Sequence, residues 1–222
     1  MTPLRQLLER SPAYARVVPY VIILALTFAQ DWFGEPARYW LYLFKMLVGL
    51  WCIVEMRSLV PEMRWAFSWE AVFVGVLICA VWVGLDPYYP KFSSSGSPWN
   101  PCKQFGQGSA LGLFFVAVRT LGSAIIVPPL EESFYRSFLY RYMVRVKFTE
   151  MPLNELNWLS LIVTSAIFGV AHYQWLGGLL CGLAFQWLVL RKNRLGDAMT
   201  AHAITNFLLG IWIYWQGAWK FW

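Results

Sequence analysis

The stretch VPPLEESFYRSFLYRYMVR, residues 127–145, places Glu131 and Glu132 side by side after about twenty mostly apolar residues. An ionisable side chain at membrane depth costs roughly 2.5–3.5 kcal/mol even on the lenient insertion scale, so such residues are candidates for function. Adjacent residues on a helix point about 100° apart, so the two carboxylates cannot both face one reacting centre. The stretch therefore predicts a helix on which the two acids have different functions.

Helical spacing separates the two acids. Glu132 and Arg136 stand at i and i+4 with the acid first, which is the favourable order for an ion pair along one face. The residue four places after Glu131 is Tyr135, which carries no positive charge. We therefore predict that Glu132 is structural and that Glu131 is the chemically active carboxylate, because an unpaired carboxylate in an apolar site suits a general base.

Pro128 and Pro129 directly precede the acids. Proline is tolerated in the first turn and often marks a helix start, so the sequence predicts that a new helix begins here with both glutamates in its first turn. First-turn acids and an i, i+4 ion pair are also ordinary where a helix begins at the membrane surface. Taken alone, the motif favours that simpler interpretation.

The composition indicates a multi-pass membrane protein. Of the 222 residues, 59% are hydrophobic and only 14% are charged, whereas soluble domains carry about a quarter charged residues. The mean hydropathy is +0.49, and the 14 Trp suit rings that lie at lipid–water boundaries. The net charge of +6 comes from short clusters between apolar runs, which favours a positive-inside pattern over nucleic-acid binding. The clusters are Arg5, Arg10 and Arg16; Arg141, Arg145 and Lys147; and Arg191, Lys192 and Arg194.

The apolar runs predict an all-α transmembrane bundle of about seven to eight helices, since about 20 helical residues cross the hydrocarbon core. The candidate spans are 17–34, 37–54, 70–85, 109–128, 157–172, 176–190 and 198–216. We expect one integral membrane domain over 1–222, with N-terminal helices in 1–85, a connector loop at 86–108 and a helical core at 109–216. The first run is followed by QDWFGEP rather than a small-residue cleavage site, so it is expected to be a retained helix.

The charges leave the topology open. The segment 130–147 is helical in pattern but carries several charges, and the basic clusters at the N-terminus, near 147 and at 191–194 all favour the cytoplasm. If 130–147 crosses as a separate span, the number of crossings between the clusters places either the N-terminus or the later clusters outside. If it is a partial or re-entrant helix, all clusters share one side.

Both histidines of the chain lie on apolar helices of the C-terminal half. In FGVAHY, Phe168 and His172 are at i and i+4, so the ring can wall the imidazole; in AHAITN, His202 and Asn206 have the same spacing. A single histidine on an apolar helix is usually a packing residue, and two polar groups on one face can simply hydrogen-bond to a neighbouring helix. These simpler interpretations are less convincing when the motifs are considered together, because the acids and both histidines fall on three helices of one bundle.

Together the three motifs resemble the CPBP family of intramembrane glutamic endopeptidases, which includes the CAAX prenyl proteases and bacterial relatives formerly called abortive-infection proteins. The family pattern is E-E-x-x-x-R, then F-x-x-x-H, then H-x-x-x-N or H-x-x-x-D. The chain has it without departure at Glu131–Arg136, Phe168–His172 and His202–Asn206. The resemblance covers roughly residues 110–210, and the N-terminal helices match nothing specific.

The resemblance implies hydrolysis of a peptide bond in a membrane-embedded cavity, with no cofactor. It implies that Glu131 and His172 position and deprotonate a water, while His202 and Asn206 donate hydrogen bonds to the developing oxyanion. Three further residues would support the site: Glu132, Arg136 and Phe168.

Three other readings stay open. Two His and two Glu could bind zinc, but no H-E-x-x-H is present and Glu132 is accounted for by Arg136. The four cysteines add no C-x-x-C pair or disulfide framework. A membrane scaffold or self-immunity protein with a vestigial site is a second reading, and a small transporter with a proton relay is a third.

The expected partners are the lipid bilayer and a membrane-anchored protein or peptide substrate, and the expected location is an integral membrane one, the inner membrane if the source is bacterial. Bacteria generally lack prenylated CAAX proteins, and the family includes members associated with exosortase-type sorting systems. A protein with a C-terminal hydrophobic sorting tail is therefore one candidate substrate.

Overall fold

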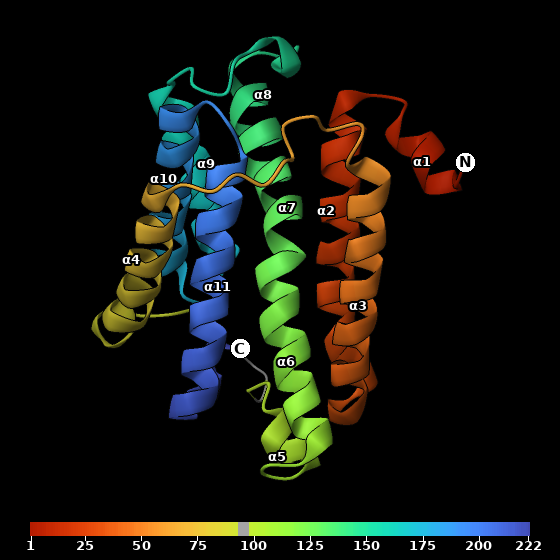
Figure 1. Cartoon of the computed structure of the whole chain (residues 1–222), viewed down its shortest axis with the longest axis vertical. Helices are drawn as coiled ribbons and strands as arrows, with labels where there is room; N and C mark the ends of the chain where they lie inside the picture. The colour runs from red at the N-terminus through yellow and green to blue at the C-terminus, as the bar shows by residue number, and fades with distance from the viewer. Residues whose placement is uncertain (93–97) are drawn as a thin grey trace.

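The computed structural model describes residues 1–92 and 98–222 as helices packed side by side (Figure 1). The described residues contain no strand, which confirms the predicted all-α class. The N-terminal half consists of α1 (Pro3–Leu8), α2 (Pro12–Ala29), α3 (Glu35–Met56) and α4 (Trp69–Leu85). The C-terminal half consists of α6 (Ala110–Ile125), α7 (Val127–Glu132), a π-helical segment (Ser133–Leu139), α8 (Tyr140–Val144), α9 (Trp158–Val170), α10 (Trp175–Lys192) and α11 (Gly196–Gln216).

The predicted connector at 86–108 contains two short helical elements. These are a 3-10 turn at Asp86–Tyr88 and the helix α5 at Pro101–Phe105. Residues 93–97 of the connector lie outside the described residues. Further 3-10 turns are found at Gln30–Phe33, Phe148–Glu150 and Trp219–Phe221.

Side-chain caps explain where the spanning helices begin. A serine or asparagine side chain at the N-cap accepts a backbone hydrogen bond from the first turn, which satisfies one of the free N–H groups there. The caps are Ser11 on α2, Ser68 on α4, Ser109 on α6 and Asn157 on α9. At the other end, Asn193 and Gly217 adopt left-handed conformations that close α10 and α11.

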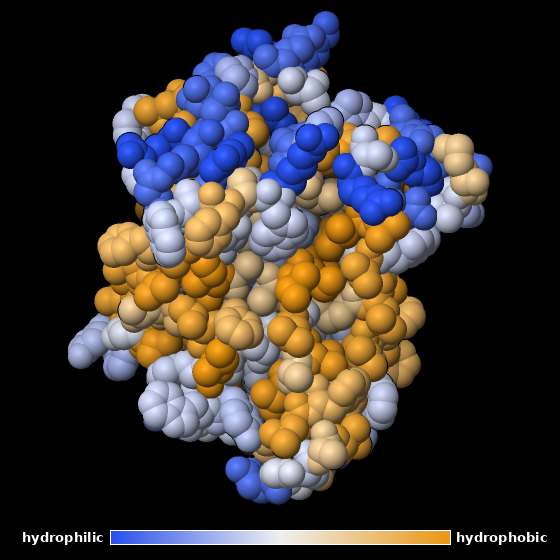
Figure 2. Space-filling model, viewed as in Figure 1, coloured by the Kyte–Doolittle hydropathy of each residue, from blue (hydrophilic) through white to orange (hydrophobic). Residues whose placement is uncertain are grey.

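The outer surface is that of an integral membrane protein. Among the described residues, four helical runs are long and apolar enough to cross a membrane: Pro12–Ala29, Glu35–Met56, Trp69–Tyr88 and Ala110–Val144. Large apolar side chains such as Phe44, Leu47, Phe73 and Ile162 are exposed on the outside of the bundle. Figure 2 shows apolar residues across the middle and lower part of the face in view and mostly hydrophilic residues above them. This pattern places the helices in lipid.

The predicted helix start at the two prolines is confirmed, since α7 begins at Val127 with proline in its first turn, but Glu131 and Glu132 lie beyond that first turn. One helical run continues from Ala110 to Val144, passing through Pro128 and Pro129 with only a turn at Ile126 (Figure 1). Proline removes a backbone hydrogen bond but keeps a helical φ, and inside a membrane bundle neighbouring helices can supply replacement partners. Here Asn206 of α11 donates from Nδ2 to the Ser123 carbonyl at 2.9 Å, just before the prolines. The acids therefore lie in the middle of a long helix.

This helical run bears on the question of topology. The segments 109–128 and 130–147 belong to one run, Ala110–Val144, that is long and apolar enough to cross a membrane. All three basic clusters contact the same end of the bundle, at the end of α3, the start of α4 or the connection between them. Arg5 donates to the Glu55 carbonyl, Arg141 pairs with Glu62, and Arg191 pairs with Glu70. The positive-inside rule assigns this end, the upper one in Figure 1, to the cytoplasm.

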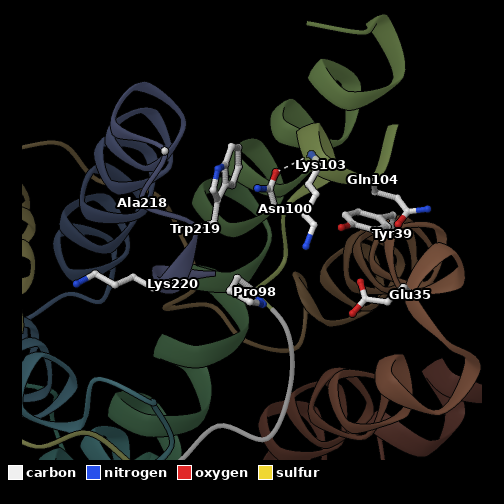
Figure 3. A pocket seen from close by; sticks show the side chains of 10 residues that line it. Glu35, Tyr39, Pro98, Asn100, Lys103, Gln104, Ala218, Trp219 and Lys220 are labelled. Carbon is white, nitrogen blue, oxygen red and sulfur yellow. Dashed lines mark hydrogen bonds between the residues drawn. The ribbon is translucent and has the colours of Figure 1, made fainter. Parts of the chain in front are cut away.

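The opposite end carries an open pocket of about 630 Å³ (Figure 3). Its lining includes Glu35 at the start of α3, Lys103 of α5, and Trp219 and Lys220 after α11. None of the three motifs contributes to its lining. It is therefore separate from the candidate site.

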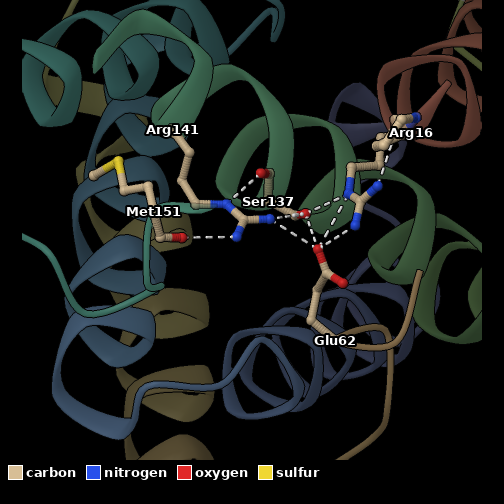
Figure 4. A network of polar contacts seen from close by, with 6 residues as sticks. Arg16, Glu62, Ser137, Arg141 and Met151 are labelled. Atoms are coloured by element: carbon tan, nitrogen blue, oxygen red, sulfur yellow. Dashed lines mark hydrogen bonds and ion pairs between the residues drawn. The ribbon is translucent and has the colours of Figure 1, made fainter. Parts of the chain in front are cut away.

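A network of polar contacts holds the cytoplasmic end of the long helix (Figure 4). Glu62 Oε1 accepts from Arg16 Nη2 at 2.6 Å and from Arg141 Nη2 at 2.9 Å. The Ser137 hydroxyl also donates to Glu62, and Arg141 Nη1 donates to the Met151 carbonyl at 3.0 Å. One carboxylate thus ties α2, the π-helical segment and α8 to the α3–α4 connection.

We expect Glu62→Gln to lower the free energy of unfolding by roughly 2 kcal/mol at neutral pH, as for other charged hydrogen bonds. Burial raises the pKa of Glu62, but the Arg16 guanidinium and the Ser137 hydrogen bond outweigh it, so the net pKa lies below its ordinary value. The stabilisation is therefore complete above the unfolded pKa of about 4.3 and is lost as the pH falls through the folded value. Unfolding of the detergent-solubilised wild type and variant at several pH values measures this. A stability difference that does not shrink in acid contradicts it.

Candidate functional site

A cavity of about 620 Å³ lies inside the bundle and brings together all four residues predicted to be catalytic. Glu131 reaches it from α7, His172 from the turn between α9 and α10, and His202 and Asn206 from α11. Helices α2, α3, α4, α6, α9 and α10 also contribute to the wall. Three sequence motifs that are far apart in the chain therefore share one chamber.

The two adjacent glutamates lie in different surroundings. Glu132 is fully buried, and its Oε2 lies 3.2 Å from Arg136 Nε, so the predicted ion pair is present. The Arg136 guanidinium also stacks 4.4 Å from the centroid of the Phe168 ring. Glu131 lines the cavity with 21% of its side chain exposed, and its Oε2 has no hydrogen-bond partner in the described part of the chain. The two acids are thus separated as the helical spacing predicts.

His202 lies between the two acids, a contact that the spacing of residues did not predict. Its Nδ1 is 2.9 Å from Glu132 Oε1, and its Nε2 is 3.9 Å from Glu131 Oε2. The ring stacks on Phe185 at 5.2 Å between centroids. An ionised carboxylate can only accept, so Nδ1 is the donor to Glu132. Glu132 therefore orients His202 as well as pairing with Arg136.

The environment of His172 fixes its tautomer. Its Nδ1 is 2.7 Å from the Phe168 carbonyl oxygen, which can only accept, so Nδ1 carries a proton. In the neutral ring, Nε2 is then an acceptor. The Phe168 ring lies 4.7 Å from the imidazole, as predicted, and Trp82 packs edge-on at 5.6 Å. The F-x-x-x-H spacing thus gives the histidine both an aromatic ring to pack against and a carbonyl hydrogen bond that orients it.

The π-helical winding of Ser133–Leu139 was not predicted, because the sequence pattern there fits an ordinary α-helix. Such wide turns are often found at functional sites. Tyr135 from this segment lines the cavity, and its hydroxyl lies 2.7 Å from that of Tyr20 on α2. The segment thereby joins the N-terminal helices to the cavity wall.

Two cations of the cavity wall were also missed: Lys45 of α3 and Arg119 of α6. Both lie inside apolar runs that were interpreted only as spans. The signal that could have found them is a single ionisable residue at membrane depth, the same signal that identified the acids.

A metal site was considered for these donors. Over residues 1–92 and 98–222, no three His, Cys, Asp or Glu side chains are grouped so that they could hold a metal ion. Glu132, which a zinc site would need as a ligand, is instead bound to Arg136 and His202.

A buried carboxylate and two oriented imidazoles share one cavity of a transmembrane bundle, an arrangement suited to hydrolysis within a membrane. Residues 112–208 match a family model described as Rce1-like, type II CAAX prenyl endopeptidase Rce1-like. The matched segment is less than half of the chain and holds all three motifs, and over it the chain is similar to CAAX-type membrane proteases. No curated protein and no solved structure matched the chain. The likeness supports an integral membrane protease in general.

Proposed function

We propose that the chain is an intramembrane endopeptidase of the glutamic type, in which Glu131 and His172 activate a water molecule. The observation that carries the proposal is that Glu131, His172, His202 and Asn206 line one cavity. Glu131 is the carboxylate left without a cationic partner at hydrogen-bond distance, while Glu132 is bound to Arg136. His172 offers an acceptor at Nε2 because its Nδ1 is bound to the Phe168 carbonyl.

In the proposed reaction, a water placed between Glu131 and His172 Nε2 attacks the carbonyl carbon of the scissile bond. Its proton passes to Glu131 as the new C–O bond forms, and the carbonyl oxygen becomes an oxyanion. When the C–N bond breaks, that proton passes to the leaving amine, so Glu131 is again ionised and water has been consumed.

The oxyanion would be held by His202 and Asn206, each such donor being worth roughly 3–4 kcal/mol in a site without bulk water. Asn206 Nδ2 uses one hydrogen on the Ser123 carbonyl, and its second hydrogen remains for a ligand. His202 Nδ1 already donates to Glu132, and its Nε2 is proposed to donate to the oxyanion when that nitrogen also carries a proton.

We further propose a substrate whose cleaved bond lies near a membrane-anchored segment, with a C-terminal hydrophobic sorting tail as one candidate. The deciding experiment compares the C-termini of membrane proteins in cells carrying the wild-type protein or Glu131→Ala. C-termini that are produced only with the wild type would identify substrates and cleavage sites. Identical sets would overturn the proteolytic function and favour a non-proteolytic scaffold or immunity role.

For the metal question, we expect cleavage by the purified protein to survive exhaustive chelation, because the proposed reaction uses only side chains. Metal analysis of the same sample should find less than one zinc per chain. Loss of activity on chelation, restored by added zinc, would replace the glutamic mechanism with a zinc-dependent one.

A further inference from the structure

Lys45 lies near the middle of its helix, and Arg119 lies in the first third of the helical run Ala110–Val144. Lys45 is the eleventh residue of the 22-residue helix α3, and Arg119 is the tenth of the 35 residues of that run. The Lys45 residue is only 7% exposed. Lipid headgroups lie at the ends of such helices, and an ion in between is costly unless it is paired or functional.

The contacts of Lys45 leave most of its hydrogen-bonding capacity unused. Its Nζ donates to Thr27 Oγ1 at 3.2 Å and lies 4.5 Å from the centroid of the Tyr42 ring. An ammonium has three donors, and no carboxylate in the described residues forms an ion pair with this one. A hydroxyl and an aromatic face hold the cation in place without neutralising it.

Arg119 shares the same aromatic ring. Its Cζ lies 5.0 Å from the Tyr42 centroid and 4.6 Å from that of Trp99. The Tyr42 hydroxyl also donates to the Arg119 carbonyl at 3.4 Å, which fixes the ring beside the guanidinium. Two cations from different helices are thus brought onto one tyrosine at the wall of the cavity.

We infer that Lys45 and Arg119 form an anion-binding subsite that takes a carboxylate of the substrate polypeptide, either its free C-terminus or an acidic side chain. The inference rests on the proposed proteolytic function. Charge attraction is strong in the low dielectric of the bundle, so a carboxylate entering from water is drawn to this part of the wall. The position of Lys45 in the middle of α3 favours a group carried by the substrate over a lipid headgroup.

The subsite also gives the bound polypeptide a direction. Lys45, Arg119 and Glu131 line the same cavity, so the cations and the proposed base share one chamber. Glu131 repels a carboxylate while Lys45 and Arg119 attract it. The substrate is therefore held with its anionic group toward the cations and its scissile bond toward Glu131.

The test measures binding rather than cleavage, so that it does not depend on turnover. Glu131→Gln protein in phosphatidylcholine nanodiscs is incubated with degenerate pools of peptides of about twelve apolar residues, long enough to enter the chamber. One pool has a free C-terminal carboxylate, a second has a C-terminal amide, and a third has the amide with glutamate as the last residue. Retained peptides are quantified by mass spectrometry for the parent, for added Lys45→Met or Arg119→Met, and for added Lys103→Met as the charge-matched control outside the cavity.

We expect the free-acid pool to be retained at least about tenfold better than the amide pool, the factor that one charged hydrogen bond supplies. Lys45→Met and Arg119→Met should remove this preference, while Lys103→Met should keep it. If the glutamate pool behaves like the free acid, the subsite takes any carboxylate; if it behaves like the amide, the ligand is the C-terminus.

Equal retention of acid and amide, a loss shared by Lys103→Met, or no retention from any pool would overturn the subsite. A second result would also overturn it: anionic phospholipid co-purifies only when Lys45 is present, and the peptide pools are all retained equally. The ligand would then be a lipid phosphate. Selective retention together with unchanged C-termini in cells would overturn the proteolytic function and leave the subsite standing. Thermal unfolding of each variant verifies that it is folded.

Discussion

Glu131→Gln is expected to abolish cleavage, with a loss of about 10²–10⁴-fold or more, while thermal unfolding stays close to that of the wild type. Glutamine fills the same volume but cannot take the proton of the attacking water. Its effect on folding should be small because Glu131 Oε2 has no hydrogen-bond partner in the described residues. Cleavage of a substrate found by comparing C-termini, together with the unfolding temperature, provides the measurement.

The matched control for this prediction is Glu150→Gln, the same chemical change at an exposed residue of the cytoplasmic end. It should leave cleavage unchanged. His172→Ala should lose activity as Glu131→Gln does, because the water then lacks its second acceptor. Full activity in Glu131→Gln combined with loss of activity in Glu132→Gln would show that the roles of the two acids are reversed.

The second large effect is expected on stability. Glu132→Ala or Arg136→Ala should lower the free energy of unfolding by about 3–5 kcal/mol and also reduce activity, because each leaves an unpaired charge in the interior. Glu132→Ala additionally releases His202 Nδ1 from its 2.9 Å contact. Chemical unfolding of the purified variants, followed by tryptophan fluorescence, gives the free energies.

The double variant Glu132→Ala, Arg136→Ala should be less destabilised than the sum of the single variants, since no isolated charge remains. Glu9→Ala serves as control, because it breaks the Arg5–Glu9 pair, which has the same i, i+4 spacing but lies at the surface. Its cost should stay below about 1 kcal/mol. A Glu132→Ala protein as stable as the wild type would mean that the buried ion pair does not support the fold.

How well the sequence predicted a contact depended on how far apart its two residues are in the chain. Pairs at i and i+4 were predicted well: Glu132 meets Arg136, and Phe168 meets His172, because one turn of a helix determines both contacts. At Pro128 and Pro129, the preference of proline for helix starts correctly predicted the beginning of α7, but the two glutamates lie beyond its first turn. The proline rule also did not show that α7 continues the helical run that begins at Ala110.

Apolar composition and helical spacing are local properties of the chain, so the sequence was sufficient to predict a membrane-spanning all-α bundle and its candidate site residues. The folded bundle was needed to show that 110–144 is one helical run, that His202 lies between Glu131 and Glu132, and that Lys45 and Arg119 line the same cavity. These features depend on which helix faces meet, and that is set by packing among many helices. The different surroundings of Glu131 and Glu132 thus follow from their spacing, whereas their shared contact with His202 is seen only in the folded bundle.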